Sequence, residues 1–276
     1  MRMTLALRQN GARDNMALLE VKELTMQFGG LTAVDSVSLE VKSGEIVSII
    51  GPNGAGKTTL FNMFTGVYKA SSGKVVFDGH DITGASPQQI VKLGMSRTFQ
   101  NLRLFQSMRV IENVLVGTHV RTKYGFFDAL LRTPRFKAEE AKKTVKAIKI
   151  IESIGLGTRI DSYAKNLPYG EQRKVEIARA IATDAKLILL DEPAAGMNPQ
   201  ESEELMNFIK DLRGRGYTVV LIEHDMSVVM RISDRIYVLD HGKLIASGKP
   251  TEIASNPEVI RAYLGGERRH AGHSRS

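Results

Sequence analysis

The sequence predicts an α/β fold with a mostly parallel core sheet, an antiparallel β lobe and a helical subdomain. A short apolar strand, 46–50, runs directly into a glycine-rich segment that opens a helical pattern. Apolar strands recur at 187–190, 218–222 and 235–239 and alternate with helical patterns, as in a parallel sheet with crossover helices. Between about 85 and 168 the pattern changes to longer helices, which predicts a separate helical region.

The N-terminal part of the chain is predicted to contribute the antiparallel β lobe. Apolar and polar residues alternate over 18–22 and again over 37–41, whereas the residues before Met16 show no periodicity. We therefore expect the fold to begin near Met16, itself a candidate alternative start, and residues 1–15 to be a disordered tail. Residues 43–45 form a turn into the apolar strand already named.

The next segments are predicted to be one helix, one short strand and then a helical region. Helical spacing over 58–65 follows the glycine-rich segment, and a turn at 71–73 leads to a strand at 74–77. Longer helical patterns follow at 87–93, 110–116 and 138–154. The stretch 118–137 contains glycine and an aromatic pair, and we interpret it as an insertion between helices.

The length and composition of the chain exclude several classes of protein. A chain of 276 residues can bury a substantial core, and the absence of cysteine excludes disulfides and thiolate metal sites. No uninterrupted apolar stretch approaches the ~20 residues that span a bilayer. We expect a cytoplasmic protein that would act at a membrane only through partner membrane proteins.

The formal net charge of +8 raises the question of a nucleic-acid partner. Both ends carry a small basic excess, and residues 119–149 hold nine Lys or Arg against three acidic residues. This excess lies in one segment rather than around an aromatic stacking surface, so we expect no nucleic-acid partner. The alternatives are a solvated helix face and attraction to anionic lipid.

A phosphate-binding loop follows the strand 46–50. The P-loop pattern is made by Gly51, Pro52, Asn53, Gly54, Ala55, Gly56, Lys57 and Thr58. In such a loop Lys57 bridges the β- and γ-phosphates and the Thr58 hydroxyl coordinates Mg²⁺. The backbone amides of Gly54, Gly56 and Thr59 lie at a helix N-terminus, where anions are favoured. The sequence therefore predicts ATP and Mg²⁺ as cofactors.

Two carboxylates end the apolar strand 187–190. A buried carboxylate is costly unless it faces a cation or donors, so Asp191 is predicted on the Mg²⁺ side of the site. Glu192 is predicted to orient and polarise the attacking water. The alternative is an N-cap pair before Pro193.

A second glycine turn precedes that strand, in the run 167–172, Leu-Pro-Tyr-Gly-Glu-Gln. This run, followed by Asp191 and Glu192, resembles the signature motif and Walker B strand of the ATP-binding cassette (ABC) family. The resemblance implies that Tyr169, Gly170 and Glu171 bind the nucleotide held by a second ATPase subunit in a head-to-tail dimer.

The resemblance also assigns three further residues. Gln100 resembles the Q-loop glutamine, which touches Mg²⁺ and water, and His224 occupies the place of the histidine that contacts the γ-phosphate. Without the resemblance, Gln100 is a turn residue and His224 an ordinary loop histidine. Phe28 is similar to the aromatic residue that stacks on adenine, with a core phenylalanine as the alternative.

Two parts of the chain depart from the common family pattern. Pro168 stands where the signature serine is usual, and Tyr169 replaces the first glycine of the pair. Pro168 is compatible with a helix first turn but offers no hydroxyl. Asn198 replaces the usual D-loop aspartate, which keeps hydrogen bonding and removes a charge.

The resemblance implies a domain division. Residues 16–94 and 169–264 are assigned to a RecA-like and antiparallel β ATP-binding lobe, 95–168 to the helical signature subdomain, and 265–276 to a disordered basic tail.

The motif at 97–105, the insertion and the C-terminal run 256–265 resemble the ATPase subunit of bacterial high-affinity branched-chain amino-acid importers. This implies amino-acid import powered from the cytoplasmic face of the inner membrane. The implied partners are a similar second ATPase or a copy of this chain, two membrane permeases and, indirectly, a periplasmic binding protein. Residues 101–117 are the expected permease contact.

Other functions stay open at this point. Related ABC ATPases serve urea or amide importers and lipopolysaccharide exporters. A soluble ABC protein of DNA repair or translation would usually carry two cassettes or a long coiled coil. A P-loop kinase would have no use for the turn at 167–172.

Overall fold

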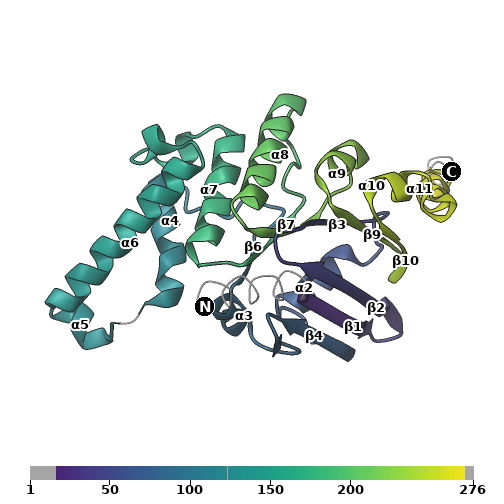
Figure 1. Cartoon of the computed structure of the whole chain (residues 1–276), viewed down its shortest axis with the longest axis horizontal. Coiled ribbons are helices and arrows are strands. Elements are labelled where there is room, and N and C mark those ends of the chain that lie inside the picture. Colours follow the sequence, from purple (N-terminus) through teal and green to yellow (C-terminus); the bar gives the residue numbers. More distant parts are fainter. Residues whose placement is uncertain (1–16, 123, 271–276) are drawn as a thin grey trace, which may run out of the picture.

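The computed structural model describes residues 17–122 and 124–270, and for Phe126 and residues 264–270 it describes the backbone alone (Figure 1). The expected N-terminal tail lies outside the described residues. The prediction of a disordered C-terminal tail over 265–276 is wrong in part, because helix α11 (Pro257–His270) includes residues 265–270. Residues 267–269 are Glu-Arg-Arg, which are good helix formers.

An antiparallel sheet forms the first lobe. Its strand order is β2-β1-β4-β5. The strands are β1 (Ala17–Phe28), β2 (Leu31–Lys42), β4 (Ser72–Phe77) and β5 (His80–Asp81). Strand β2 begins six residues before the alternation at 37–41, because its first part pairs with β1 through register shifts that interrupt the period of two. Strand β2 passes directly against the glycine-rich loop that follows, at Ala33.

A six-stranded sheet forms the centre of the molecule, in the order β10-β9-β3-β8-β7-β6. Its strands are β3 (Ile46–Ile50), β6 (Met95–Arg97), β7 (Leu187–Asp191), β8 (Thr218–Ile222), β9 (Arg235–Asp240) and β10 (Lys243–Gly248). All pairs are parallel except β9 with β10. Every residue of β3, β7 and β8 is buried, as expected for parallel strands covered on both faces.

Helices cover the faces and edges of this sheet. They are α2 (Lys57–Phe64), α3 (Pro87–Leu93), α8 (Pro199–Gly214), α9 (Met226–Ile232) and α10 (Pro250–Ala254). The carboxyl ends of β3, β7 and β8 lie at one edge of the sheet, which is where parallel α/β sheets place their ligand sites.

A helical region lies to one side of the sheet (Figure 1). It contains α4 (Val110–Thr118), α5 (Phe126–Leu130), α6 (Pro134–Ser153) and α7 (Tyr169–Ala182), with short 3₁₀ turns at His119–Arg121, Gly157–Arg159 and Ala164–Asn166. Helix α4 approaches α7 closely at Gly117, where an added Cβ would meet the carbonyl oxygen of Arg179. The stretch 118–137 therefore consists of the end of α4, one 3₁₀ turn, α5 and the start of α6.

Packing does not follow the expected boundaries at 95 and 169. Strand β6 pairs with β7 in the parallel sheet, so residues 95–97 belong to the ATP-binding lobe. Helix α7 packs against α4 and α6, which places 169–182 with the helical region. The turn at 167–172 was too short a signal to show which lobe its helix would join. Within the described residues no helix is long and apolar enough to cross a bilayer.

Candidate functional site

The glycine-rich loop connects the end of β3 with the start of α2. Gly51 has φ of 149° and Gly56 has φ of 98°, a region that side chains rarely adopt. A Cβ on Gly51 would clash with the carbonyl oxygen of Leu239, and one on Gly56 would lie 2.5 Å from that of Ala33. Glycine is required at both positions because β2 and β9 pass directly against the loop.

A pocket of 420 Å³ opens over this loop. Its lining comes from the loop, from β2 and from the turn between β9 and β10: Leu31, Thr32, Ala33, Asn53, Gly54, Ala55, Gly56, Lys57, Thr58, Thr59, Glu192, His241 and Gly242. No side chain caps the N-terminus of α2, since its N-cap is Gly56. An uncapped helix N-terminus at the floor of a pocket fits a phosphate group. The predicted residues Gly54, Thr58 and Thr59 all line it.

Lys57 lies in the floor of the pocket. Its Nζ donates hydrogen bonds to the carbonyl oxygens of Gly51 at 2.7 Å and Pro52 at 3.0 Å. Burial lowers the pKa of Lys57, while the nearby charges of Glu192 and Asp191 act in the opposite direction. The ammonium group is thus held at the mouth of the loop, where a phosphate can replace one carbonyl as its acceptor.

Asp191 ends β7 and forms a buried ion pair that the sequence did not reveal. Arg97 Nη2 lies 2.5 Å from Asp191 Oδ2, and the side chains are only 7% and 6% exposed. Arg97 Nη1 also donates to Asn62 Oδ1 at 2.6 Å, which ties β6 to α2. The available signal was weak: Arg97 closes a short strand beside the one that carries Asp191.

The three predicted catalytic residues come together from separate loops. Gln100 Nε2 donates a hydrogen bond to Glu192 Oε2 at 2.7 Å, and His224 Nδ1 lies 3.9 Å from the same oxygen. Glu192 has φ of 45°, which is strained for a non-glycine residue. Its amide donates to the Ile222 carbonyl at 2.9 Å, which fixes it beside the end of β8.

Comparison with known proteins identifies the family. A family model described as ABC transporter matches residues 34–195, more than half of the chain, from β2 to the loop after Glu192. The chain belongs to the ABC transporter ATPase family. A second model, described as branched-chain amino acid ATP-binding cassette transporter, matches residues 243–269.

Relatives of this ABC ATPase align over nearly their whole length. The chain is 51% identical over 249 residues to the high-affinity branched-chain amino acid transport ATP-binding protein LivG of Salmonella typhimurium, covering 90% of this chain and 98% of that protein. It is 46% identical to BraF of Pseudomonas aeruginosa, described in the same words, with the same coverage.

Solved structures confirm the predicted fold class. The ADP conformation of an ATP-binding cassette of an ABC transporter superposes with a TM-score of 0.80 at 35% identity, covering 91% of this chain and 100% of that chain. A nucleotide-free cassette gives 0.78 at 35% identity, covering 90% of this chain and 99% of that chain. As an ABC ATPase the chain binds ATP.

The signature turn of this ABC ATPase lies away from its own phosphate pocket. Tyr169, Gly170 and Glu171 form the first turn of α7, and none of them lines the pocket described above. Pro168 is the N-cap of α7, one residue before the first-turn position expected for it. Its ring offers no capping oxygen, so no side chain caps α7 either.

A buried arginine joins the signature helix to the Gln100 loop, and sequence reasoning missed it. Arg173 donates to the carbonyl oxygens of Phe99 and Gln100, each at 2.8 Å. Arg173 Nη1 also lies 2.7 Å from Glu176 Oε2, and both side chains are buried. Helical spacing alone gave no reason to place a charged pair of α7 in the interior.

Glu223 is a second buried group that the sequence reasoning left aside. Its Oε1 accepts a hydrogen bond from the Ala194 amide at 3.1 Å. Burial raises the pKa of Glu223. The contact links the residue before His224 with the loop after Glu192, so the two loops hold each other in place.

Phe28 and Asn198 are surface residues of this ABC ATPase. Phe28 ends β1, is 43% exposed and packs edge to face on Tyr68 with ring centroids 5.4 Å apart, so it is not a core residue. It does not line the pocket. Asn198 is the N-cap of α8. Its side-chain oxygen accepts a hydrogen bond from the Glu201 amide, and its own amide donates to the Glu201 carboxylate, so the Asn198 side chain is used for capping.

The described residues contain no group of three or more acidic, histidine or cysteine side chains that could hold a metal by itself. Mg²⁺ commonly takes one or two protein ligands and completes its shell with phosphate and water. Thr58 and Glu192 line the pocket, Gln100 donates a hydrogen bond to Glu192, and the charge of Asp191 acts on Lys57. The oxygens of Thr58, Asp191 and Gln100 fit that kind of site.

Proposed function

We propose that the chain is the ATP-hydrolysing subunit that powers import of amino acids, most directly branched-chain ones, through partner membrane permeases. The observation that carries this is the alignment with LivG over 98% of its length, together with the C-terminal match to the branched-chain family model. A match confined to the P-loop and Walker B strand would support only ATP binding.

The proposed site uses the loops at the carboxyl edge of the central sheet. Lys57 and the backbone amides of Gly54, Gly56 and Thr59 would hold the phosphates, with Phe28 against the adenine. Thr58, Asp191 and Gln100 would hold Mg²⁺, which would neutralise phosphate charge. This assignment requires Asp191 to serve the metal site while it remains paired with Arg97.

Glu192 is proposed to accept a proton from the attacking water. Its Oε2 already accepts a hydrogen bond from Gln100, which fixes the orientation of the carboxylate. His224, 3.9 Å away, is proposed to contact the γ-phosphate. The strained backbone at Glu192 supports a functional role, because strain of this kind concentrates at active sites.

The signature residues Tyr169, Gly170 and Glu171 are proposed to act on the partner's nucleotide. None of them lines the chain's own pocket, which supports a head-to-tail dimer with a paralogue or a second copy. Without a hydroxyl at Pro168, the contact rests on backbone amides at the start of α7, where the helix has no side-chain cap. Pro168→Ser tests whether the hydroxyl limits dimer affinity.

The dimer is proposed to dock on two permeases at the cytoplasmic face of the inner membrane, with a periplasmic binding protein acting indirectly. Residues 101–117 are the proposed permease contact. Arg173 supports this, because it ties Gln100, the residue directly before that segment, to the signature helix. A displacement of this segment would therefore also displace α7.

Reconstitution with candidate permeases in proteoliposomes tests the proposal. ATPase activity should rise when the permeases and a binding protein loaded with leucine are present, and labelled leucine should accumulate. Stimulation only by urea or an amide would replace the substrate assignment. Stimulation by nucleic acid without permeases would contradict a transport role.

A further inference from the structure

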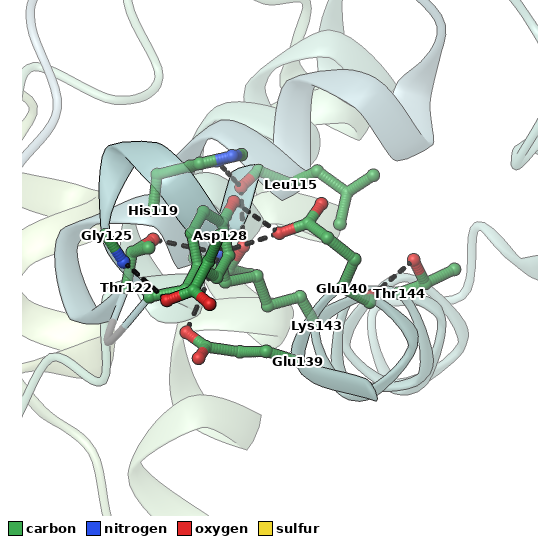
Figure 2. A network of polar contacts seen from close by, with 11 residues as sticks. Leu115, His119, Thr122, Gly125, Asp128, Glu139, Glu140, Lys143 and Thr144 are labelled. Atoms are coloured by element: carbon green, nitrogen blue, oxygen red, sulfur yellow. Dashed lines mark hydrogen bonds and ion pairs between the residues drawn. The ribbon is translucent and has the colours of Figure 1, made fainter. Parts of the chain in front are cut away.

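Residues 119–149 use their three acidic residues in contacts within the segment. Asp128 accepts hydrogen bonds from the Gly125 amide at 3.3 Å and the Thr133 hydroxyl at 3.0 Å, which closes both ends of α5. Figure 2 shows Asp128 turned toward Gly125 inside this network. Its carboxylate is therefore occupied within the insertion.

The other two acidic residues flank a buried lysine. Lys143 Nζ lies 2.9 Å from Glu140 Oε1 and 4.0 Å from Glu139 Oε1, and it donates to Thr122 Oγ1 at 2.8 Å (Figure 2). Tyr124 donates its hydroxyl proton to Glu140 at 2.8 Å. These contacts join the start of the insertion to α6, so Glu139 and Glu140 balance the charge of a largely buried lysine.

The basic residues on the outside have no such internal balance of charge. Arg132, Lys137, Lys142 and Lys149 are exposed along α6 and the turn before it. Lys142 also lines two adjoining grooves of 460 and 730 Å³ beside α6. The exposed surface of 132–149 is therefore rich in cations.

An apolar cluster lies at the tip of the same segment. Phe127, Leu130 and Leu131 are 74%, 65% and 73% exposed. Spaced by three and four positions, they share one side of α5 and the turn that follows. In Figure 1 the tip of α5 and α6 is an extremity of the molecule, at the end opposite to α11.

We propose that this apolar tip and the adjacent cations of α6 bind the surface of a bilayer that contains anionic lipids. Exposed large apolar side chains beside Lys and Arg are the composition of membrane-surface segments. The apolar side chains would enter the headgroup region, and Arg132, Lys137 and Lys142 would pair with lipid phosphates. Nucleic acid fits less well, because Phe127 is the one exposed aromatic ring for stacking among the described side chains of the tip.

Binding to the bilayer requires both the apolar side chains of the tip and the basic side chains beside them. Each basic side chain near an anionic surface strengthens binding about fivefold, and single apolar residues give weak, reversible insertion. Such a contact would hold the ATPase at the membrane beside any protein partner. It involves none of the residues of the phosphate pocket and does not depend on which solute is transported.

Sedimentation of the full chain with lipid vesicles tests the proposal. The wild type should bind mixed phosphatidylcholine–phosphatidylglycerol vesicles far more tightly than phosphatidylcholine vesicles, and added salt should weaken the binding. The triple variant Arg132→Ala, Lys137→Ala, Lys142→Ala should bind about 100-fold more weakly. Leu130→Ser with Leu131→Ser should also release the protein.

A matched control removes three exposed lysines elsewhere, by Lys22→Ala, Lys165→Ala and Lys210→Ala. It lowers the net charge equally and should keep anionic vesicle binding within about threefold of wild type. All these variants should unfold at the wild-type denaturant concentration, since the altered side chains are exposed.

Three results would overturn the proposal: no wild-type binding to anionic vesicles, equal loss in the two triple variants, or tip variants that bind vesicles normally yet lose permease-stimulated ATPase activity. The last result would assign the surface to a protein partner. Because the vesicle assay contains neither permease nor nucleotide, it does not test the transport role, and each proposal can fail separately.

Discussion

Arg97 and Asp191 form a buried ion pair across neighbouring strands of the central sheet, with Nη2 and Oδ2 2.5 Å apart. Asp191 is therefore compensated before any ligand arrives. A buried carboxylate without such a partner would shift toward its neutral form and lose its value as an anion beside a phosphate site.

Arg97→Ala should destabilise the protein by about 3–5 kcal/mol, because it leaves Asp191 buried and unpaired. Urea unfolding of the nucleotide-free protein measures this. Arg109→Ala is the matched control, since Arg109 pairs with Asp161 at 3.2 Å while the side chains are 48% and 81% exposed. That variant should lose less than about 1 kcal/mol, and equal losses would contradict the importance of burial.

Lys57→Ala should weaken ATP binding at least about 100-fold, since hydrogen bonds to charged groups are worth about 1.5–3 kcal/mol each. Isothermal titration with ATP checks it. Lys69→Ala removes an exposed lysine outside the pocket and should bind like wild type. Tight ATP binding by Lys57→Ala would undermine the assignment of the phosphate loop.

Glu192→Gln should bind ATP but hydrolyse it about 10²–10⁴-fold more slowly, because an amide cannot accept the proton of water. The variant should accumulate as an ATP-bound dimer in size-exclusion chromatography. The exposed Glu203→Gln should leave the rate unchanged. Wild-type turnover in Glu192→Gln would remove Glu192 from its proposed role.

Gly117→Ala should destabilise the helical region by about 1–3 kcal/mol, because the new methyl group meets the Arg179 carbonyl and forces α4 away from α7. Gly214→Ala should instead stabilise the protein. Gly214 lies in α8 with nothing within 4 Å of an added Cβ, so alanine should stabilise by about 0.5–1 kcal/mol. Thermal unfolding of both variants gives the comparison.

Glu223 should make stability depend on pH. Since burial raises the pKa of Glu223, the folded state keeps a proton that the unfolded chain has already lost. Stability from this group is complete below the ordinary glutamate pKa and falls as the pH rises through the raised pKa.

Glu223→Gln keeps an acceptor for the Ala194 amide and should remove the decrease in stability at rising pH. Urea unfolding at about pH 4 and about pH 8 measures the effect. Relative to wild type, the free energy of unfolding of the variant should be higher at about pH 8 than at about pH 4. An unchanged difference between the two proteins at both pH values would show that Glu223 does not titrate differently on folding.

The local patterns were sufficient for the parallel strands β3, β7, β8 and β9 and for the phosphate loop. Each of these strands is a short apolar run, and a loop that must cradle phosphate needs glycines at fixed spacing. The parallel strand β6 was not predicted, because its three residues, Met-Ser-Arg, form no apolar run. The early part of β2 was not predicted, because register shifts against β1 interrupt the alternation on which the prediction rested.

The sequence by itself determined which motifs are the candidates for the chemistry: the glycine-rich loop with Lys57, the carboxylates at the end of β7, and a second glycine turn. Spacing along the chain is enough for these, since each motif is local. Only the tertiary structure decided their partners. The pairings Arg97 with Asp191, Gln100 with Glu192 and Arg173 with the Gln100 loop each join different elements, and the burial that makes charge pairing necessary is a property of the packed molecule.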